Sequence, residues 1–153
     1  MVDITVRQAV LTDLDALTSL FDAYRQFYGK PSDVIAARCF LRARFTHGES
    51  VLFLARNEDK KAIGFTQLYP SFSSTAMARI FVLNDLYVAP EARGSGAGQR
   101  LLRAAADYAS SVGAVRLTLS TALDNLTAQS VYEANGWKRD HQFYVYNLPL
   151  NAA

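Results

Sequence analysis

Hydrophobic residues recur at helical spacing through the first third of the chain. Residues 3–7 alternate between polar and apolar positions, which predicts a short strand. From Thr12 onward, apolar side chains return every three or four residues, which predicts a helix that Gly29 ends. A second set of apolar anchors predicts another helix over residues 32–47.

The pattern changes to strands after residue 50. Residues 51–56, 62–69 and 79–88 predict three strands, separated by the polar segment 57–61 and the serine-rich segment 70–75. The remaining elements are a helix over 94–112, a strand over 115–121, a helix over 125–135 that Gly136 ends, and a final strand over 142–148.

The predicted element order is therefore βααβββαβαβ. Consecutive strands favour antiparallel hairpins, and the strand–helix–strand unit over residues 79–121 favours one right-handed parallel crossover. We therefore expect an α/β fold with a mixed, mostly antiparallel sheet and helices on both of its faces.

Composition narrows the class of protein. The chain has 153 residues, of which 50% are hydrophobic and 20% charged, so we expect residues 1–153 to form a single folded domain. A net charge of +2 does not favour binding to nucleic acid or to a membrane. The lone Cys39, expected to be a buried residue of the second helix, predicts a reduced, cytoplasmic setting. His47 and His141 lack companions at ligand spacing, so no metal site is expected.

A glycine motif, residues 93–98 with the sequence Arg-Gly-Ser-Gly-Ala-Gly, lies between a predicted strand and a predicted helix. Glycines let the backbone approach a ligand closely. The first amide groups of a helix have no internal acceptor, and together with the helix dipole they favour an anion. The motif therefore predicts a diphosphate site.

Two other nucleotide-binding motifs do not fit the spacing of residues 94–100. A P-loop needs Lys followed by Ser or Thr after the last glycine, whereas Gln99 and Arg100 follow Gly98. A dinucleotide fingerprint starting at Gly94 needs a glycine where Gln99 stands. The pattern R-x-x-G-x-G fits, although a loop that only turns the chain tightly remains an alternative.

Three features in order resemble the GNAT family of N-acetyltransferases. They are the segment Asn-Asp-Leu-Tyr-Val at 84–88, the glycine motif, and Asn125 followed by Tyr-Glu-Ala-Asn-Gly-Trp at 132–137. The resemblance covers nearly the whole chain and implies the GNAT fold. It also implies acetyl-CoA as acyl donor, direct transfer to a primary amine of a small molecule, amino acid or peptide, and, from family habit, a homodimer.

The resemblance implies where the cofactor binds. The implied cofactor residues are Leu86, Tyr87, Val88, Arg93, Gly94, Ser95, Gly96, Ala97, Gly98, Gln99, Asn125 and Tyr132. In the family the strand before the motif separates from the next strand and the pantetheine arm lies between them. A backbone N–H near Leu86 would then stabilise the oxyanion.

The resemblance also implies catalytic roles for Tyr132 and Asp85. Tyr132 would protonate the departing thiolate, and it shares a helix face with Asn125 about 10.5 Å away along the axis. Alternatively, Tyr132 is a core residue. Asn125 could cap the helix, either alone or together with its cofactor role. Family members use differing general bases, often a carboxylate on the strand before the motif or a water relay, and Asp85 is the nearest match. A carboxylate in an apolar run is costly unless it is paired or functional. Alternatively, Asp85 bonds the backbone at a bulge or faces solvent.

The acceptor side is aromatic rather than acidic. Family members form it from the first two helices and the loop after the central hairpin, which here hold Tyr24, Tyr28, Tyr69 and Phe72. Such a set does not favour a polycation such as an aminoglycoside, and the rings could instead pack the core or a dimer interface. A non-catalytic acetyl-CoA sensor is the main alternative to an enzyme.

Overall fold

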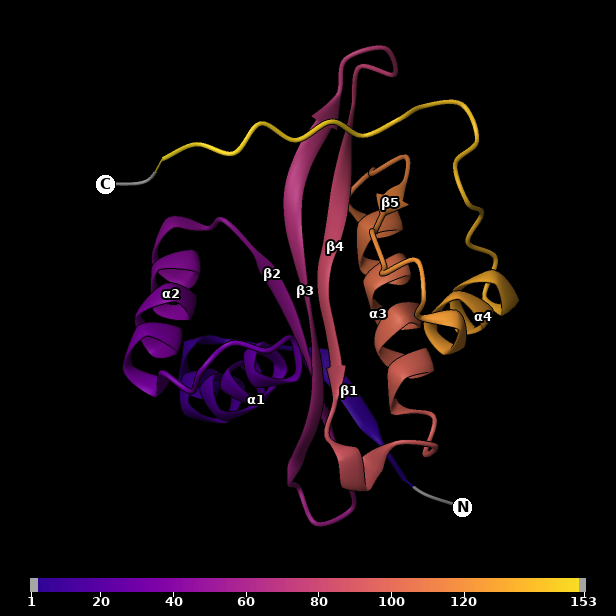
Figure 1. The fold of residues 1–153 in the computed structure, drawn as a ribbon. Helices are drawn as coiled ribbons and strands as arrows, with labels where there is room; N and C mark the ends of the chain where they lie inside the picture. Colours follow the sequence, from indigo (N-terminus) through magenta and orange to yellow (C-terminus); the bar gives the residue numbers. More distant parts are fainter. Residues whose placement is uncertain (1–2, 152–153) are drawn as a thin grey trace. The chain divides into compact units, whose positions relative to one another are not determined.

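The computed structural model describes residues 3–151. The chain divides into two units, Met1–Ser120 and Thr121–Ala153. The first unit holds a five-stranded sheet with three α-helices, and the second holds one α-helix (Figure 1).

The sheet of the first unit has its strands in chain order. They are β1 (Thr5–Gln8), β2 (Val51–Arg56), β3 (Ala62–Ser73), β4 (Ala78–Val88) and β5 (Leu117–Thr118). The first three pairings are antiparallel, whereas β4 and β5 are parallel. The expected mixed, mostly antiparallel sheet is confirmed.

Helices cover both faces of this sheet. Helices α1 (Leu14–Phe27) and α2 (Val34–His47) lie on one face, and α3 (Ala97–Ser111) lies on the other and connects β4 to β5 (Figure 1). Two short 3₁₀ turns, η1 (Leu11–Asp13) and η2 (Pro90–Ala92), precede α1 and α3. We call the face under α1 and α2 the acceptor face.

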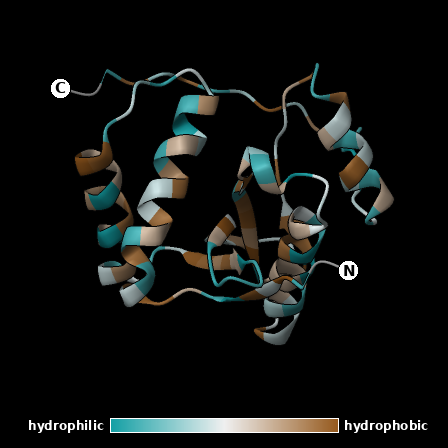
Figure 2. Cartoon of the chain, turned by 90° about the horizontal axis from the view of Figure 1, so that it is seen from below, coloured by the Kyte–Doolittle hydropathy of each residue, from teal (hydrophilic) through white to brown (hydrophobic). Residues whose placement is uncertain are grey.

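Each face of the sheet has its own apolar layer. On the acceptor face, Leu17, Leu41 and Phe65 are fully buried in one cluster. On the other face, Tyr108 of α3 packs against Phe53 and Phe81 at ring-centroid distances of 5.7 and 5.8 Å. The helices carry hydrophobic and hydrophilic positions side by side, as amphipathic helices do (Figure 2).

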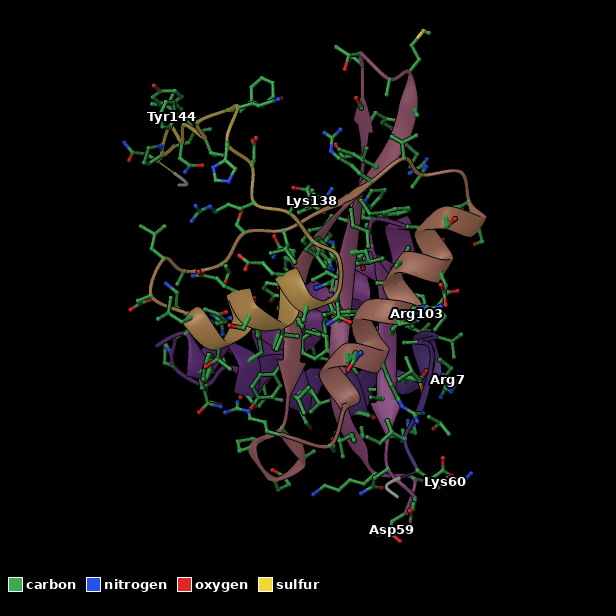
Figure 3. All side chains as sticks on the ribbon, turned by 90° about the vertical axis from the view of Figure 1, so that its right-hand side faces the viewer. Arg7, Asp59, Lys60, Arg103, Lys138 and Tyr144 are labelled. Carbon is green, nitrogen blue, oxygen red and sulfur yellow. The ribbon has the colours of Figure 1, made fainter. Side chains whose placement is uncertain are left out.

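The polar side of α3 faces solvent. Arg103 projects from this helix (Figure 3) and forms an ion pair with Asp107 at 3.3 Å, one turn further on. Both side chains are exposed, so this pair contributes little to stability. No helix of the described chain is long and apolar enough to cross a membrane.

Asp13 joins the start of α1 to two strands. Its carboxylate accepts two hydrogen bonds of 2.7 Å from Arg7 of β1, and a third of 3.3 Å from Arg56 of β2. The Arg7 hydrogen bond is the main reason why the pKa of Asp13 falls to about 2. This buried carboxylate therefore holds the first helix in place in its charged form.

The structure corrects two predicted boundaries in the central hairpin. Residues 70–73, expected in a loop, continue β3 as far as Ser73, which pairs with Ala78. Because β2 begins opposite Leu68, β3 has only one neighbouring strand beyond that point, and such an edge tolerates Pro70. The predicted strand over 115–121 is reduced to Leu117–Thr118.

The predicted final strand over 142–148 is wrong, because no strand occurs after β5 among residues 3–151. Alternating side chains show only a preference for extended backbone, and a strand also needs a hydrogen-bonded neighbour. The preceding helix is as predicted: α4 spans Leu126–Ala134, and Gly136 has a φ of +89°.

Cys39 is exposed and not buried as expected. Helix α2 meets the core through Ala37 and Leu41. Cys39 lies two residues from each, about 200° around the helix, and so points away from the sheet.

Candidate active site

The glycine motif forms the turn between η2 and α3. Gly94 and Gly96 have φ angles of +80° and +89°, a region that favours glycine. Gly96 caps α3, and the Ser95 hydroxyl donates to the carbonyl oxygen of Ala92 at 2.5 Å. The motif therefore lies at the start of a helix, as the sequence predicts.

The first amide groups of α3 have no acceptor among residues 3–151. The hydrogen bonds of the helix begin at Arg100 N, which donates to Gly96 O at 3.1 Å. Within the described residues, the N–H groups of Ser95, Gly96, Ala97, Gly98 and Gln99 donate to nothing. A Cβ added at Gly94 or Gly96 would meet no atom within 4 Å, so the turn is open as well as rich in donors. Such a turn suits an anion.

Arg93 anchors the motif to the rest of the unit. Its Nε donates to the carbonyl oxygen of Val88 at 3.1 Å. Its guanidinium carbon lies 5.3 Å from the ring centre of Phe27 and 5.8 Å from that of Tyr87. The side chain thus ties the turn to β4 and α1 through cation–π contacts.

Strand β4 bulges beside the predicted general base. Gln67 pairs with Asp85, but the next residue, Leu68, pairs with Leu83, so Asn84 is the extra residue. Strand β5 pairs only with Phe81 and Val82, which precede the bulge. In the described part of the sheet, β4 from Leu83 onward therefore has no strand neighbour on the side of β5.

Asp85 is a buried carboxylate held by two amides. Only 2% of the residue is exposed. Gln67 Nε2 donates to its Oδ2 at 2.5 Å, and Asn84 Nδ2 donates to its Oδ1 at 2.9 Å. Asp85 therefore neither faces solvent nor spends its side chain on the backbone, although the bulge lies next to it.

Two tyrosines lie close enough to Asp85 to respond to its charge. Burial, and then the negative charge of Asp85, raise the pKa of Tyr24 well above its ordinary value. The same two causes raise the pKa of Tyr69 to about 12, against an opposing effect of Arg44. Both phenols thus stay neutral at physiological pH beside an acidic group.

The predicted acceptor residues divide between two places. Tyr24 and Tyr28 are in edge-to-face contact, with ring centres 5.0 Å apart, and Tyr24 also contacts Tyr87 at 6.2 Å. Phe72 lies near the far end of β3, is 67% exposed, and contacts the Arg79 guanidinium at 4.7 Å. No ring contact in the described chain joins Phe72 to Tyr24 or Tyr28.

The two candidate residues of the second unit lie on α4. Asn125 caps this helix, because its Oδ1 accepts from Ala128 N at 3.2 Å. The ring centre of Tyr132 lies 6.0 Å from that of Trp137. The cap role of Asn125 is observed, whereas the cofactor roles of both residues stay predictions. No cluster of three or more potential metal ligands occurs in the described residues.

Comparison with known proteins decides the family. A model of the acetyltransferase (GNAT) family matches residues 15–137. The chain belongs to the GNAT family. It is an N-acetyltransferase that takes its acetyl group from acetyl-CoA.

Individual relatives agree along nearly the whole chain. Uncharacterized N-acetyltransferase YhfO of Bacillus subtilis (strain 168) is 51% identical over 146 residues, 94% of this chain and 97% of that protein. A probable acetyltransferase of Haemophilus influenzae is 32% identical over 142 residues, 91% of this chain and 93% of that protein. The crystal structure of a probable acetyltransferase has 43% identity and a TM-score of 0.92, covering 97% of this chain and 99% of that one.

Sequence reasoning about this GNAT enzyme missed two polar residues near the candidate base. Gln67 is fully buried and donates directly to Asp85. The charge of Arg44, in α2, lowers the pKa of Tyr69. A glutamine inside the apolar run 62–69 was a signal that could have been used. Arg44 gave no such signal, because basic residues are common in the last turn of a helix.

Proposed function

We propose that this GNAT enzyme acetylates the primary amine of a small molecule, with Asp85 as general base and Tyr132 as general acid. The buried Asp85, held by two side-chain amides beside a β-bulge, is the observation that carries the proposal. A carboxylate buried there can act as a general base and accept a proton from the attacking amine.

The glycine motif would bind the diphosphate of acetyl-CoA. Support comes from the unpaired amide groups of residues 95–99 and from the open space around Gly94 and Gly96. The pantetheine arm would lie along Leu86, Tyr87 and Val88, where β4 has lost β5 as its neighbour. Asn125 would contact this arm, and the Leu86 N–H would stabilise the oxyanion.

The chemical step needs three proton transfers. The amine reaches the site as an ammonium ion and first loses one proton to solvent. The neutral amine then attacks the thioester carbonyl carbon, and its nitrogen gives a second proton to Asp85, which later releases it to solvent. A carbon–nitrogen bond forms and the carbon–sulfur bond breaks. The departing thiolate takes a proton from Tyr132, which solvent then reprotonates.

Relatives with named acceptors support an amine on a small molecule. Thialysine N-epsilon-acetyltransferase of Bos taurus is 36% identical over 84 residues. Aminoglycoside N(6')-acetyltransferase type 1 of Stenotrophomonas maltophilia is 25% identical over 105 residues. In this chain, Tyr24, Tyr28 and Tyr69 would surround the acceptor near Asp85, with Phe72 further along β3.

Three coarser properties are also proposals. A single domain over residues 1–153 is supported by the family match, which extends across both units. A cytoplasmic location is supported by the single cysteine. A homodimer is supported by family habit alone.

The test is thiol release from acetyl-CoA over a panel of small amines, followed by Asp85→Asn on whichever amine reacts. We expect turnover with at least one amine and its loss in the variant. Acetyl-CoA that binds tightly but reacts with no amine would instead support the non-catalytic sensor.

A further inference from the structure

Three buried side-chain polar atoms in the described chain have no hydrogen-bond partner. They are Arg44 Nε, Ser50 Oγ and Gln67 Oε1. Buried polar groups in folded proteins are nearly always paired, so each exception calls for an explanation. Gln67 is the clearest case, because the whole residue is 0% exposed.

The strand register brings two of these atoms to one place. Leu52 pairs with Gln67 and Val51 with Leu68, so Ser50 comes next, beside Tyr69. Alternate residues of a strand share a face, which puts Ser50, Gln67 and Tyr69 on the same side as Leu52 and Phe65. Leu52 and Phe65 belong to the core cluster under α1 and α2, so this is the acceptor face.

Arg44 reaches the same region from the last turn of α2. Its positive charge lowers the pKa of Tyr69, whereas the negative charge of Asp85 raises it. Its guanidinium stacks on Phe40 at 4.4 Å from the ring centre, and Nη2 forms an ion pair with Glu49 at 3.2 Å. Nε is left without an acceptor. The ion pair with Glu49, the residue before Ser50, brings the Arg44 side chain close to Ser50.

The two ends of this region suit ligand groups of opposite charge. Gln67 spends its Nε2 on Asp85, so the atom left over is an acceptor. Reversing the amide would point its oxygen at the carboxylate. Asp85 and Gln67 Oε1 together suit the N–H groups of an ammonium ion. Arg44 Nε and the Ser50 hydroxyl can both donate, and together they suit a carboxylate.

The spacing separates these two ends. One two-residue step along β3, from Gln67 to Tyr69, covers roughly 7 Å. An α-amino acid, whose amine and carboxylate are attached to one carbon, is too short to bridge that gap.

We propose that the acceptor is an ω-amino carboxylate, an amine separated from a carboxylate by a chain of several bonds. Asp85 and Gln67 hold its ammonium group, and Arg44 and Ser50 hold its carboxylate. This inference rests on the proposed function, because it assigns the acceptor of that same site.

The first test compares three substrates with the unmodified enzyme. Hexylamine and 6-aminohexanoate have the same chain length, but only 6-aminohexanoate has the carboxylate, and glycine has both groups on one carbon. We expect kcat/KM for 6-aminohexanoate to exceed that for hexylamine at least about tenfold, mainly through KM, because a charged hydrogen-bonded pair is gained. Glycine should be the poorest of the three.

Variants then locate the carboxylate. Arg44→Gln should lower kcat/KM for 6-aminohexanoate about tenfold and leave hexylamine within about twofold, because only the former uses the guanidinium. Ser50→Ala should have the same selectivity with a smaller loss. Arg42→Gln is the matched control, since Arg42 is an exposed arginine of the same helix.

Gln67 tests the amine end. Gln67→Leu should lower kcat/KM for hexylamine and 6-aminohexanoate by the same factor, because both present the same ammonium group. A thermal melt shows whether each variant is folded, and the substrate comparison in the unmodified enzyme needs no variant.

The outcomes separate this inference from the proposed function. Equal kcat/KM for hexylamine and 6-aminohexanoate, or equal losses for both in folded Arg44→Gln, would overturn the carboxylate site and leave amine acetylation standing. No acetylation of any amine would overturn the proposed function, and this inference with it.

Discussion

The glycine motif and the surroundings of Asp85 both belong to the first unit but are built differently. The motif is a continuous run of residues whose main chain supplies the chemistry, through positive φ angles and unpaired amides. The Asp85 region uses side chains from α1, α2, β3 and β4, and it exists only because a bulge and a strand register align them. A motif of the first kind should tolerate changes in side chains that project away from it, whereas the second kind should be sensitive at each contributing element.

The largest effect is expected from a change at Asp85. Asp85→Asn should lower kcat by about 10²–10⁴-fold, because an amide cannot take the proton of the amine. The dissociation constant of acetyl-CoA should stay the same, since Asp85 lies on the acceptor face. Steady-state thiol release and calorimetric titration measure the two quantities. Asp107→Asn, an exposed acid of α3, is the control, and an undiminished kcat in Asp85→Asn would exclude Asp85 as the base.

The next largest effect is expected from a change in the glycine motif. Gly96→Glu should weaken acetyl-CoA binding by about 100-fold or more, because it places a negative charge beside the diphosphate. Gly96→Ala is the matched control: it suffers the same strain at a φ of +89° without the charge, and should keep most of the affinity. Unchanged affinity in a folded Gly96→Glu would show that the diphosphate binds elsewhere.

A smaller effect tests whether the second unit contributes to the same reaction. Tyr132→Phe should lower kcat about tenfold or more, because the thiolate then leaves without its proton donor. The KM for acetyl-CoA should change little. Tyr144→Phe, another tyrosine of the same unit, should react at the normal rate. If Tyr132→Phe also does so, the tyrosine has no part in the mechanism.

The smallest effect concerns stability alone. Asp13→Asn should destabilise the protein by about 1–2 kcal/mol at pH 7, a value reduced because Arg7 is half exposed. The pKa of Asp13 is about 2 when folded and 3.8 ordinarily, so its contribution is present above pH 3.8 and lost as the pH falls through 2. The variant and the parent should therefore converge in chemical denaturation experiments in acid. A constant difference at all pH values would contradict the Arg7–Asp13 pairing.

Local features of the chain were predicted well. The strand over 51–56 has the expected bounds, and the glycine motif starts a helix, because φ preference and unpaired amides depend only on neighbouring residues. The final strand over 142–148 was wrong because alternation does not supply a partner strand. The extension of β3 to Ser73 was missed for the opposite reason, since its partner β4 compensates for an unfavourable local sequence.

The candidate site, too, was predictable from the sequence only in part. Asp85 was found as an acid in an apolar run, but its burial and its two amide donors were not predictable. The position of Gln67 beside it depends on pairing between residues 18 apart in the chain. Arg44 and Ser50 had no signal at all, because the relevance of Ser50 depends on the sheet face that it shares with Tyr69, and that of Arg44 on where the end of α2 lies.

The amino-acid sequence by itself determined the family, the acetyl-CoA chemistry and the place of the glycine motif, since these depend on residues that are close together in the chain. Tertiary structure alone decided that Asp85 is buried, that Gln67 holds it, and that the charges of Asp85 and Arg44 both affect the pKa of Tyr69. The physical reason is that a strand register and a helix docking angle bring together side chains from distant positions, and no short segment of sequence specifies either.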